Sequence, residues 1–424
     1  MTEKLNTRHL RIIRNRLPAL FSYVGSSGAM MVGIGSQLIS FAFLARYLGA
    51  DQFGLLMTVT AATALALNVC GLGAGEAFMR RIALEKDLYP ALLGHALLLT
   101  LSTGIVLTLI VMIFFVAFSP GMVTGFGGLL PLGLFVFANV AIYRWIVICE
   151  NIFLGYKMFS NANLIVLVFG ILRAGATILA TLVFDVHQLT DWVWWHVAIH
   201  IIGLIGCLYL LKNFPAPKLK IITEELPLGI HFCVTYFFST LTQNADRLVL
   251  STFTSPAIVG SYALASRFFY TSVLTSNAYM RLRYPALAAA SGENAQALVK
   301  LCLSYLAPVL GIAFLTSAGL FIAAPFLPMI FGEGYQSAVP HLQIGCWLIV
   351  PIALTSIPYD ALGASARHVL RAWIVNIGGV ISVLVLIVLT YAYGITGMFV
   401  ALFASHAGLA ALLWLALFKL RRER

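Results

Sequence analysis

The stretch QNADRLVLSTFTSPAIVGSYALASR, residues 243–267, carries three ionisable side chains between and within apolar segments. Ser255 and Pro256 predict a tight turn that ends one membrane helix and starts the next. Asp246, Arg247 and Arg267 are costly in hydrocarbon, where such groups are found facing a bundle interior or a water-filled cavity. We therefore expect this helical hairpin to carry functional side chains.

A similar pattern occurs about half a chain earlier, in LARYLGADQFGLLMTVTAA, residues 44–62. Shifts of 206 and 210 positions relate residues of the same type or role in the two halves. The related pairs are Tyr47 and Phe253, Phe53 and Val259, Gly54 and Gly260, Glu150 and Asp360, and Lys157 and Arg367. The two halves therefore look like copies, and residues 243–267 open the second copy.

The composition indicates a polytopic membrane protein. The chain is 61% hydrophobic and 10% charged, whereas soluble domains are roughly a quarter charged. A span needs about 20 apolar residues. Twelve segments qualify: 20–46, 54–78, 88–118, 128–155, 161–184, 190–211, 226–252, 256–282, 297–323, 338–363, 368–390 and 395–418.

The positive charges follow the topology of these spans. The net charge of +11 suggests nucleic acid at first, but the cations fall in every second loop. They are Lys4, Arg8, Arg11, Arg14, Arg16, Arg80, Arg81, Lys86, Lys157, Lys212, Lys218, Lys220, Arg281, Arg283, Lys300, Arg367, Arg371, Lys419, Arg421, Arg422 and Arg424. By the positive-inside rule both termini and these loops are cytoplasmic. The charge thus records topology and gives no sign of nucleic acid binding.

The predicted organisation is two six-helix lobes. Residues 1–19 form a basic amphipathic lead-in, 20–211 the N-lobe, 212–225 a cytoplasmic linker with two prolines, 226–418 the C-lobe and 419–424 a basic cytoplasmic tail. Because each lobe has an even number of spans, the copies share one orientation, as parallel repeats related by an axis along the membrane normal. The six cysteines stand alone inside spans, so we interpret them as packing residues.

Charged residues within the spans are the candidate functional groups. The cations are Arg144, Arg173, Arg247 and Arg267, with Arg46 at the outer end of the first span; the acids are Glu76, Glu150, Asp246 and Asp360. A cavity lined by unpaired arginines attracts an anion, above all a diphosphate, whose oxygens match the guanidinium fork.

The alternative for these charges is a set of buried ion pairs that fix helix register. Arg173, on a more peripheral helix, fits this alternative best. We expect Glu76 to pair with Arg80, four residues away on one helix face. Glu150 and Asp360 are either helix-end residues partnered by Lys157 and Arg367, or functional acids.

Motifs for other chemistry are weak or missing. His196 and His200 are four residues apart, a spacing that can hold a metal, but no carboxylate or cysteine lies near them on that face, so we expect polar interface residues and no metal. The sequence has no GxGxxG, Walker, nucleophile-elbow or HExxH motif. We therefore predict a protein without a cofactor that is not an enzyme.

Four segments resemble the Wzx-type polysaccharide transporters of the multidrug/oligosaccharidyl-lipid/polysaccharide exporter superfamily. They are ARYLGADQFGLLMTVTAATAL, NADRLVLSTFTSPAIVGSYALASRF, FGEGYQSAVPHLQI and YGITGMFVALFASH. The resemblance implies an all-α fold of twelve transmembrane helices with a V-shaped central cavity in the bacterial inner membrane. It also implies alternating access that flips a polyprenyl-diphosphate-linked oligosaccharide from the inner to the outer leaflet, for O-antigen of lipopolysaccharide, capsule or exopolysaccharide.

In that family the cavity is cationic, and Arg144, Arg247 and Arg267 match this description by type and depth. From its depth, we expect Arg267 to meet the diphosphate during crossing, while Arg247 and Asp246 act at the outward gate. Coupling to a proton or sodium gradient would use an acid, with Asp246 as first candidate, then Glu150 and Asp360. Arg173 and Arg46 are further possible contacts, and polymerase or assembly proteins are possible partners.

Three other functions stay open. A small-molecule or drug exporter of the same superfamily is disfavoured because the deep charges are mostly arginine. A membrane glycan polymerase, ligase or glycosyltransferase is disfavoured because the predicted outer loops are about ten residues or fewer, too short for an acceptor site. A structural scaffold leaves the deep arginines unexplained.

Overall fold

A computed structural model of the chain describes the backbone of residues 2–365 and 367–420, and side chains from Gly28 onward except at Met30, Glu293, His368 and Leu420. All regular elements in this described part are helices. The predicted lead-in belongs to the backbone of the first helix, but its side chains are not described. Most of the predicted basic tail, residues 421–424, lies outside the described residues.

The chain divides into two compact units. Unit 1 comprises Met1–Tyr47 and Ala62–Phe237, and unit 2 comprises Leu48–Ala61 and Phe238–Arg424. Helices that begin in unit 1 are α1 (Thr2–Val69), α2 (Ala74–Ile82), α3 (Tyr89–Phe118), α4 (Pro120–Gly125), α5 (Leu129–Phe137), α6 (Tyr143–Gly155), α7 (Phe159–Leu182), α8 (Leu189–Leu211) and α9 (Leu226–Phe253). Helices wholly in unit 2 are α10 (Pro256–Glu293), α11 (Ala295–Ala323), α12 (Leu327–Phe331), α13 (Ala338–Gly345), α14 (Ile349–Ala364) and α15 (His368–Leu420).

Two helices therefore contribute to both units. The middle of α1 passes through unit 2, and α9 begins in unit 1 and ends in unit 2. The predicted lobe boundaries, 20–211 and 226–418, remain a prediction.

Eight helical stretches in the described chain are long and apolar enough to cross a membrane. Two of them, Met31–Ile82 and Val369–Lys419, have 52 and 51 residues, more than twice the roughly 20 needed for one crossing. Each contains a non-helical glycine at a predicted turn: Gly49 with φ 70° and ψ 171°, and Gly394 with φ 59° and ψ −139°. Dividing these two stretches there gives ten apolar segments in the described chain, and α9 and α10 are not among them, so the twelve predicted spans remain a prediction.

The predicted turn at Ser255 and Pro256 is confirmed. Helix α9 ends at Phe253 and α10 begins at Pro256, with Ser255 in the extended N-cap conformation. Proline suits this position because the first helical N–H has no partner within the helix.

The glycines that the repeat pairs with each other, Gly54 and Gly260, also touch each other in unit 2. A Cβ added to Gly54 would stand 1.8 Å from the carbonyl oxygen of Pro256, and one added to Gly260 would stand 2.0 Å from that of Ala50. Neither glycine has space for a side chain, so α1 and α10 cross with their backbones in contact. Small residues allow this approach between membrane helices.

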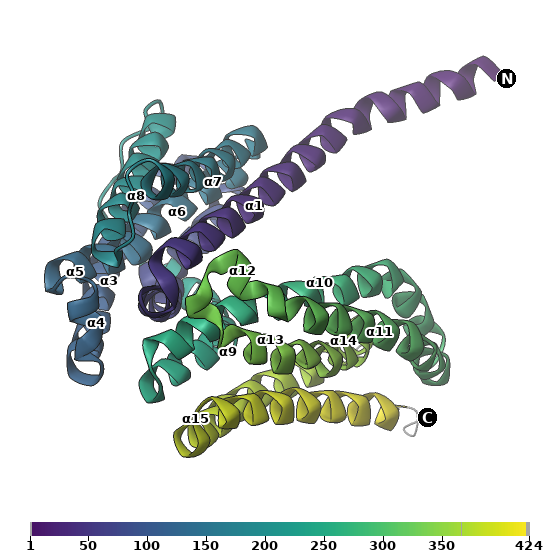
Figure 1. Cartoon of the computed structure of the whole chain (residues 1–424). Coiled ribbons are helices and arrows are strands. Elements are labelled where there is room, and N and C mark those ends of the chain that lie inside the picture. Colours follow the sequence, from purple (N-terminus) through teal and green to yellow (C-terminus); the bar gives the residue numbers. More distant parts are fainter. Residues whose placement is uncertain (1, 366, 421–424) are drawn as a thin grey trace. The chain divides into compact units, whose positions relative to one another are not determined.

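In unit 2 the long α10 packs against α11, α13 and α14, and α14 packs against α15, which folds back on itself at Gly394 (Figure 1). The predicted tenth span is divided into α13, the short η7 (Cys346–Leu348) and α14. Pro351 follows this break and Pro358 lies inside α14, consistent with the loss of a backbone hydrogen bond at each proline.

In unit 1 the second predicted span is broken at the short helix η1 (Cys70–Gly73), where Gly71, Leu72 and Gly73 all have positive φ. A Cβ on Gly73 would stand 2.0 Å from the carbonyl oxygen of Gly229, so α9 packs directly on the break. Elsewhere in unit 1, α2 packs against α6, α3 packs against η1, and α7 packs against α8.

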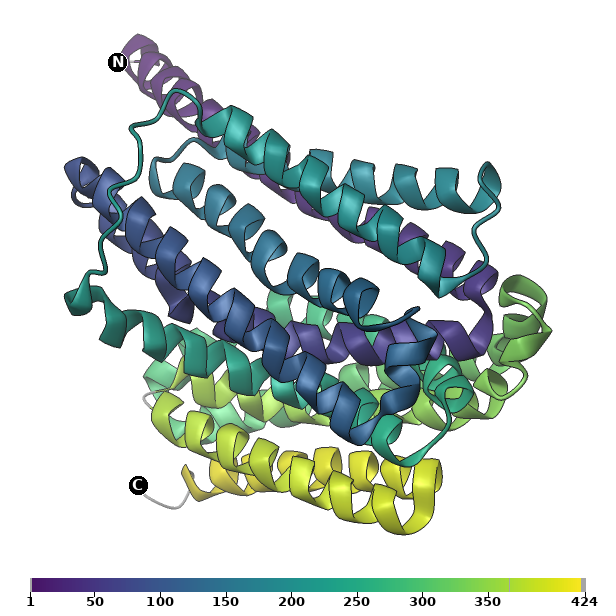
Figure 2. The same ribbon diagram turned by 90° about the vertical axis from the view of Figure 1, so that its left-hand side faces the viewer.

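The connection from α8 to α9 is an extended segment bound to α3 (Figure 2). The backbone N–H of Lys218 donates to the carbonyl oxygen of Pro90 at 2.7 Å, and that of Ile222 donates to His95 Nδ1 at 3.0 Å. Near its end, Glu225 forms an ion pair with Arg81 at 3.4 Å. The segment is therefore a fixed part of unit 1.

The loop between α7 and α8 holds the end of the first predicted span. His187 Nδ1 lies 3.2 Å from the carbonyl oxygen of Tyr47, and its Nε2 lies 2.9 Å from Asp185 Oδ1. Both acceptors are satisfied only by the protonated ring, which donates from both nitrogens. These hydrogen bonds, that to Tyr47 first, raise the pKa of His187.

The glycine crossing yields a stability prediction. Gly54→Ala and Gly260→Ala should each lower the free energy of unfolding by about 1–3 kcal/mol, because the added methyl overpacks a backbone contact. Gly408→Ala is the matched control, since nothing lies within 4 Å of its Cβ position. Thermal unfolding of purified variants in detergent measures the difference; equal melting temperatures for all three variants would disprove the crossing.

The His187 contacts yield a pH prediction. A histidine whose pKa is raised in the folded state contributes stability below its unfolded pKa, about 6.5, and loses that contribution as the pH rises through the folded pKa. The wild type should therefore lose thermal stability between pH 6 and 8 relative to His187→Gln. Melting curves of both proteins across this range measure it, and parallel pH profiles would refute it.

Candidate functional site

Each unit buries one network of charged side chains. In unit 1 the network joins α6 to α2 through Arg144 and Glu76, and in unit 2 it joins α9 to α10 through Asp246. Arg144 and Asp246 are 5% and 3% exposed. A charge in the interior requires close partners, and the two units provide them in different ways.

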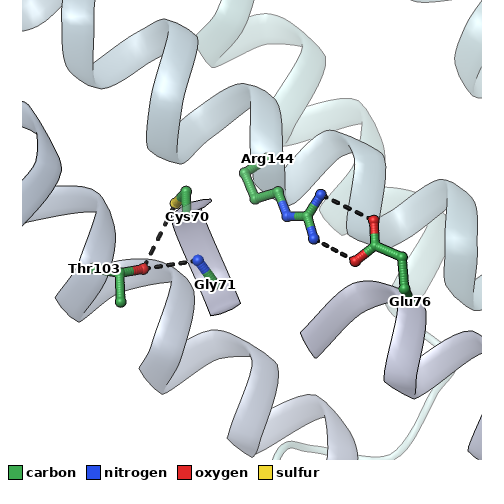
Figure 3. A network of polar contacts seen from close by, with 5 residues as sticks. All are labelled: Cys70, Gly71, Glu76, Thr103 and Arg144. Atoms are coloured by element: carbon green, nitrogen blue, oxygen red, sulfur yellow. Dashed lines mark hydrogen bonds and ion pairs between the residues drawn. The ribbon is translucent and has the colours of Figure 1, made fainter. Parts of the chain in front are cut away.

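Arg144 forms a two-pronged ion pair with Glu76. Its Nη1 lies 3.2 Å from Oε1 and its Nη2 lies 2.5 Å from Oε2 (Figure 3). This parallel arrangement is the strongest geometry for an arginine and a carboxylate. The expectations that Glu76 pairs with Arg80 and that Arg144 lacks an acidic partner are both wrong, because the partner comes from another helix 68 residues away.

The break in the second span lies against this guanidinium. Cβ positions at Gly71 and Gly75 would stand 3.7 Å from Arg144 Nε and 3.6 Å from its Nη2. Thr103 holds the break by accepting from the backbone N–H of Gly71 at 2.7 Å (Figure 3). Glu76 thereby lies in the first turn of the short helix α2, where the helix dipole stabilises a negative charge.

Asp246 is bound by two tyrosines of α10. The Tyr262 hydroxyl donates to Asp246 Oδ2 at 2.5 Å and the Tyr270 hydroxyl donates to the same oxygen at 3.4 Å. The backbone N–H of Arg247 donates to Oδ1 at 2.8 Å. His406 of α15 is close enough to interact electrostatically with the carboxylate. Asp246 therefore joins α9 to α10 through hydrogen bonds.

The two deep arginines of unit 2 lie on the two facing helices of the hairpin. Arg247 Nη2 lies 3.4 Å from the hydroxyl of Ser266, the residue before Arg267. Arg247 Nε is buried without a hydrogen-bond partner, and Arg267 is half-buried on α10. Asp246 and Arg247 meet different groups on α10, as expected from the angle of about 100° between neighbouring residues on a helix.

The remaining candidates lie apart from these networks. Arg173 is half-buried on α7, close enough to interact with Tyr143 and the histidine pair. Arg46 is exposed on α1.

Neither Glu150 nor Asp360 has an ion-pair partner within 4 Å in the described chain. Asp360 lines a cavity of about 450 Å³ with Arg281 and Tyr359. Arg371, which stacks on Tyr359 with 4.4 Å from guanidinium to ring centre, also interacts with Asp360.

His196 and His200 pack among aromatic rings of unit 1, with their ring centres 4.3 Å apart. His196 Nε2 lies 2.9 Å from Asn139 Nδ2. In the described residues no group of three or more His, Cys, Asp or Glu side chains is placed to hold a metal. The pair thus lies within a polar cluster beside the π-helical turn η3 (Ala138–Ile142).

Sequence reasoning missed Tyr262, Tyr270, His406 and the role of Glu76. For Tyr262 a signal was present: Asp246 and Tyr262 both lie about two helical turns from the turn at Ser255, so a hairpin brings them to one level. No comparable signal relates Glu76 to Arg144, because the two helices are not neighbours in sequence.

Comparison with known proteins assigns the chain to a family. A family model described as polysaccharide biosynthesis protein matches residues 25–291. No protein with a curated description matches the chain.

Solved structures share the fold. An inward-facing multidrug resistance MATE family transporter of the MOP superfamily aligns with a TM-score of 0.71 at 16% identity, over 95% of this chain and 99% of the other. An outward-facing structure with the same family description gives 0.58 at 15% identity, over 95% and 97%. A Vibrio cholerae MATE transporter in the bent form gives 0.51 at 15% identity, also over 95% and 97%. At these identities the likeness shows the fold.

The Arg144 pair yields a prediction about stability. Glu76→Gln leaves a buried guanidinium without its counter-charge and should lower the free energy of unfolding by about 3–5 kcal/mol. The matched control is Glu85→Gln, whose pair with Arg81 is exposed, with side chains 51% and 41% accessible; it should change stability by less than about 1 kcal/mol. Chemical unfolding in detergent compares the two, and a Glu76→Gln protein as stable as Glu85→Gln would contradict the pairing.

Proposed function

The chain belongs to the polysaccharide biosynthesis protein family, and we propose that it is a flippase that moves polyprenyl-diphosphate-linked oligosaccharides from the inner to the outer leaflet of the bacterial cytoplasmic membrane. It is a multi-pass membrane protein with the fold of MATE transporters of the MOP superfamily. That fold has been solved facing inward and facing outward, which supports alternating access as the mechanism. The observation that carries the choice of substrate is the pair of deep arginines on α9 and α10.

Arg247 and Arg267 are suited to a diphosphate. A bilayer core about 30 Å thick blocks such a headgroup, and paired guanidinium groups offer planar forks that match phosphate oxygens. Arg247 has an unoccupied buried Nε–H, and its guanidinium contacts Ser266, the residue before Arg267. In this proposal the two arginines bind the diphosphate, with Arg267 contacting it during crossing and Arg247 nearer the outward gate.

In this proposal the substrate must compete with Glu76 for binding to Arg144. Its fork is occupied by Glu76, so a phosphate oxygen binds there only when it replaces the carboxylate. Because Glu76 lies on the short α2 after the break at η1, its release would free α2 from α6. Arg173 and Arg46 are the more distant possible contacts.

Asp246 is the proposed coupling acid, ahead of Glu150 and Asp360. As a carboxylate it accepts from Tyr262 and Tyr270. When it binds a proton, the new O–H is a donor, and one tyrosine hydroxyl must change partner. Proton binding would thus alter the polar contact between α9 and α10, beside Arg247. Sodium coupling and contacts with polysaccharide polymerase or assembly proteins are not required by this scheme.

A transport assay tests the proposal. In liposomes that contain a fluorescent polyprenyl-diphosphate oligosaccharide, the purified protein should make the lipid accessible to a quencher outside the vesicle. Arg267→Gln should slow this exchange by about tenfold or more, the effect of losing a hydrogen bond to a charged group. Arg283→Gln, an exposed arginine on the same helix, is the matched control and should exchange at the wild-type rate.

Proton coupling through Asp246 is tested with an imposed pH gradient. The gradient should accelerate the wild type and leave Asp246→Asn unaffected, while Asp51→Asn, at an exposed aspartate, should respond as the wild type does. Export of small organic cations without exchange of the lipid-linked oligosaccharide would identify a drug exporter and overturn the flippase. If the wild-type exchange rate does not change with the gradient, proton coupling is disproved but the flippase activity is not.

A further inference from the structure

A groove of about 450 Å³ runs along α3 in unit 1. Its walls come from α3, α5, η3, α6, α8 and the extended segment after α8, and nearly all are aliphatic or aromatic, including Leu97, Phe137, Trp145 and Phe214. Leu101 and Leu208 on its rim are 51% and 50% exposed. An apolar groove with exposed leucines on its rim, in the spanning part of a membrane protein, opens to hydrocarbon chains of the bilayer.

Two hydroxyl groups on the groove wall have no partner. The Tyr89 hydroxyl and Thr100 Oγ1 are buried without a hydrogen bond, and the residues are 1% and 4% exposed. Both belong to α3, about 16 Å apart along the helix axis. Buried polar groups in native proteins are almost always bonded, so the groove is built for a ligand that carries hydrogen-bond acceptors as well as an apolar chain.

The end of the groove near Tyr89 is basic. Lys212, Lys218 and Lys220 are exposed on the segment that closes this end, and Lys212 Nζ lies 3.9 Å from the centre of the Tyr209 ring. The segment packs directly on α3, since a Cβ added to Gly94 would stand 1.9 Å from the Lys218 carbonyl oxygen. Such a lysine cluster at the membrane surface attracts anionic headgroups.

The groove reaches only part of the way across the membrane. It extends from Tyr89 to Leu101, less than half of the 30 residues of α3, starting at the basic face. The positive-inside rule assigns this face to the cytoplasm. The hydrocarbon chain of a transported lipid must move with its headgroup to the other leaflet, so it would leave such a groove. The chain of a lipid that remains in the cytoplasmic leaflet would stay bound.

We propose that this groove binds one acyl chain of an anionic phospholipid of the cytoplasmic leaflet, with the headgroup at the three lysines and the Tyr89 hydroxyl donating to a phosphate or ester oxygen. Because Thr100, at the deep end, lies against Gly71 of the break in the second span, the bound chain ends beside the Arg144 network. The site is independent of the transported substrate.

Native mass spectrometry of the purified full chain tests the site. With phosphatidylglycerol and phosphatidylcholine of identical acyl chains as probes, the wild type should retain phosphatidylglycerol about tenfold better. Leu97→Trp fills the groove and should abolish this preference, and Tyr89→Phe should weaken phosphatidylglycerol binding about fivefold, by loss of one hydrogen bond. The matched control Leu384→Trp, at an exposed leucine of α15, should bind as the wild type does.

Melting curves confirm that each variant is folded, and Leu208→Trp, on the exposed rim, replaces Leu97→Trp if the latter unfolds. Equal retention of the two lipids by the wild type, or unchanged preference in the groove-filling variant, would overturn the proposal. Displacement of phosphatidylglycerol by a polyprenyl phosphate at equal concentration would assign the groove to the substrate chain and also overturn it.

Discussion

A charged group inside a membrane must find its partners within the protein, because lipid offers neither donors nor acceptors. This constraint organises both units. Arg144 is paired with Glu76 across α6 and α2, and Asp246 accepts hydrogen bonds from Tyr262 and Tyr270 across α9 and α10. Each contact ties together helices that ordinary apolar packing holds only weakly in lipid. The same polar contacts are the groups that an anionic substrate or a proton would disturb.

Broken helices accompany the charges. The second span unwinds at Gly71–Gly73, next to the guanidinium of Arg144, and leaves Glu76 on a short helix of its own. Irregular backbone of this kind is tolerated in membranes where other protein segments cover it, and here α9 packs on it through Gly229. The arrangement brings a carboxylate, a short helix and a guanidinium together in one place.

The two halves are copies in outline and differ in their charged groups. Residues 48–61 belong to the unit of the second half, and residues 226–237 to the unit of the first, so each half lends a helical segment to the other. In unit 2 the segment 48–61 of α1 crosses α10, with Gly54 and Gly260 at the contact. The first half pairs a carboxylate, Glu76, with an arginine, Arg144, whereas in the second half Asp246 is bound by two tyrosines.

The sequence by itself determined the helical membrane fold and the hairpin at Ser255 and Pro256, because apolar length and turn residues are local properties. It also placed Asp246, Arg247 and Arg267 on one hairpin. Only the tertiary structure decided that Glu76 belongs to Arg144, that Tyr262 and Tyr270 hold Asp246, and that α3, α6 and α8 enclose a groove. Such pairings depend on the rotation and crossing of helices far apart in the chain, and a helical periodicity fixes neither.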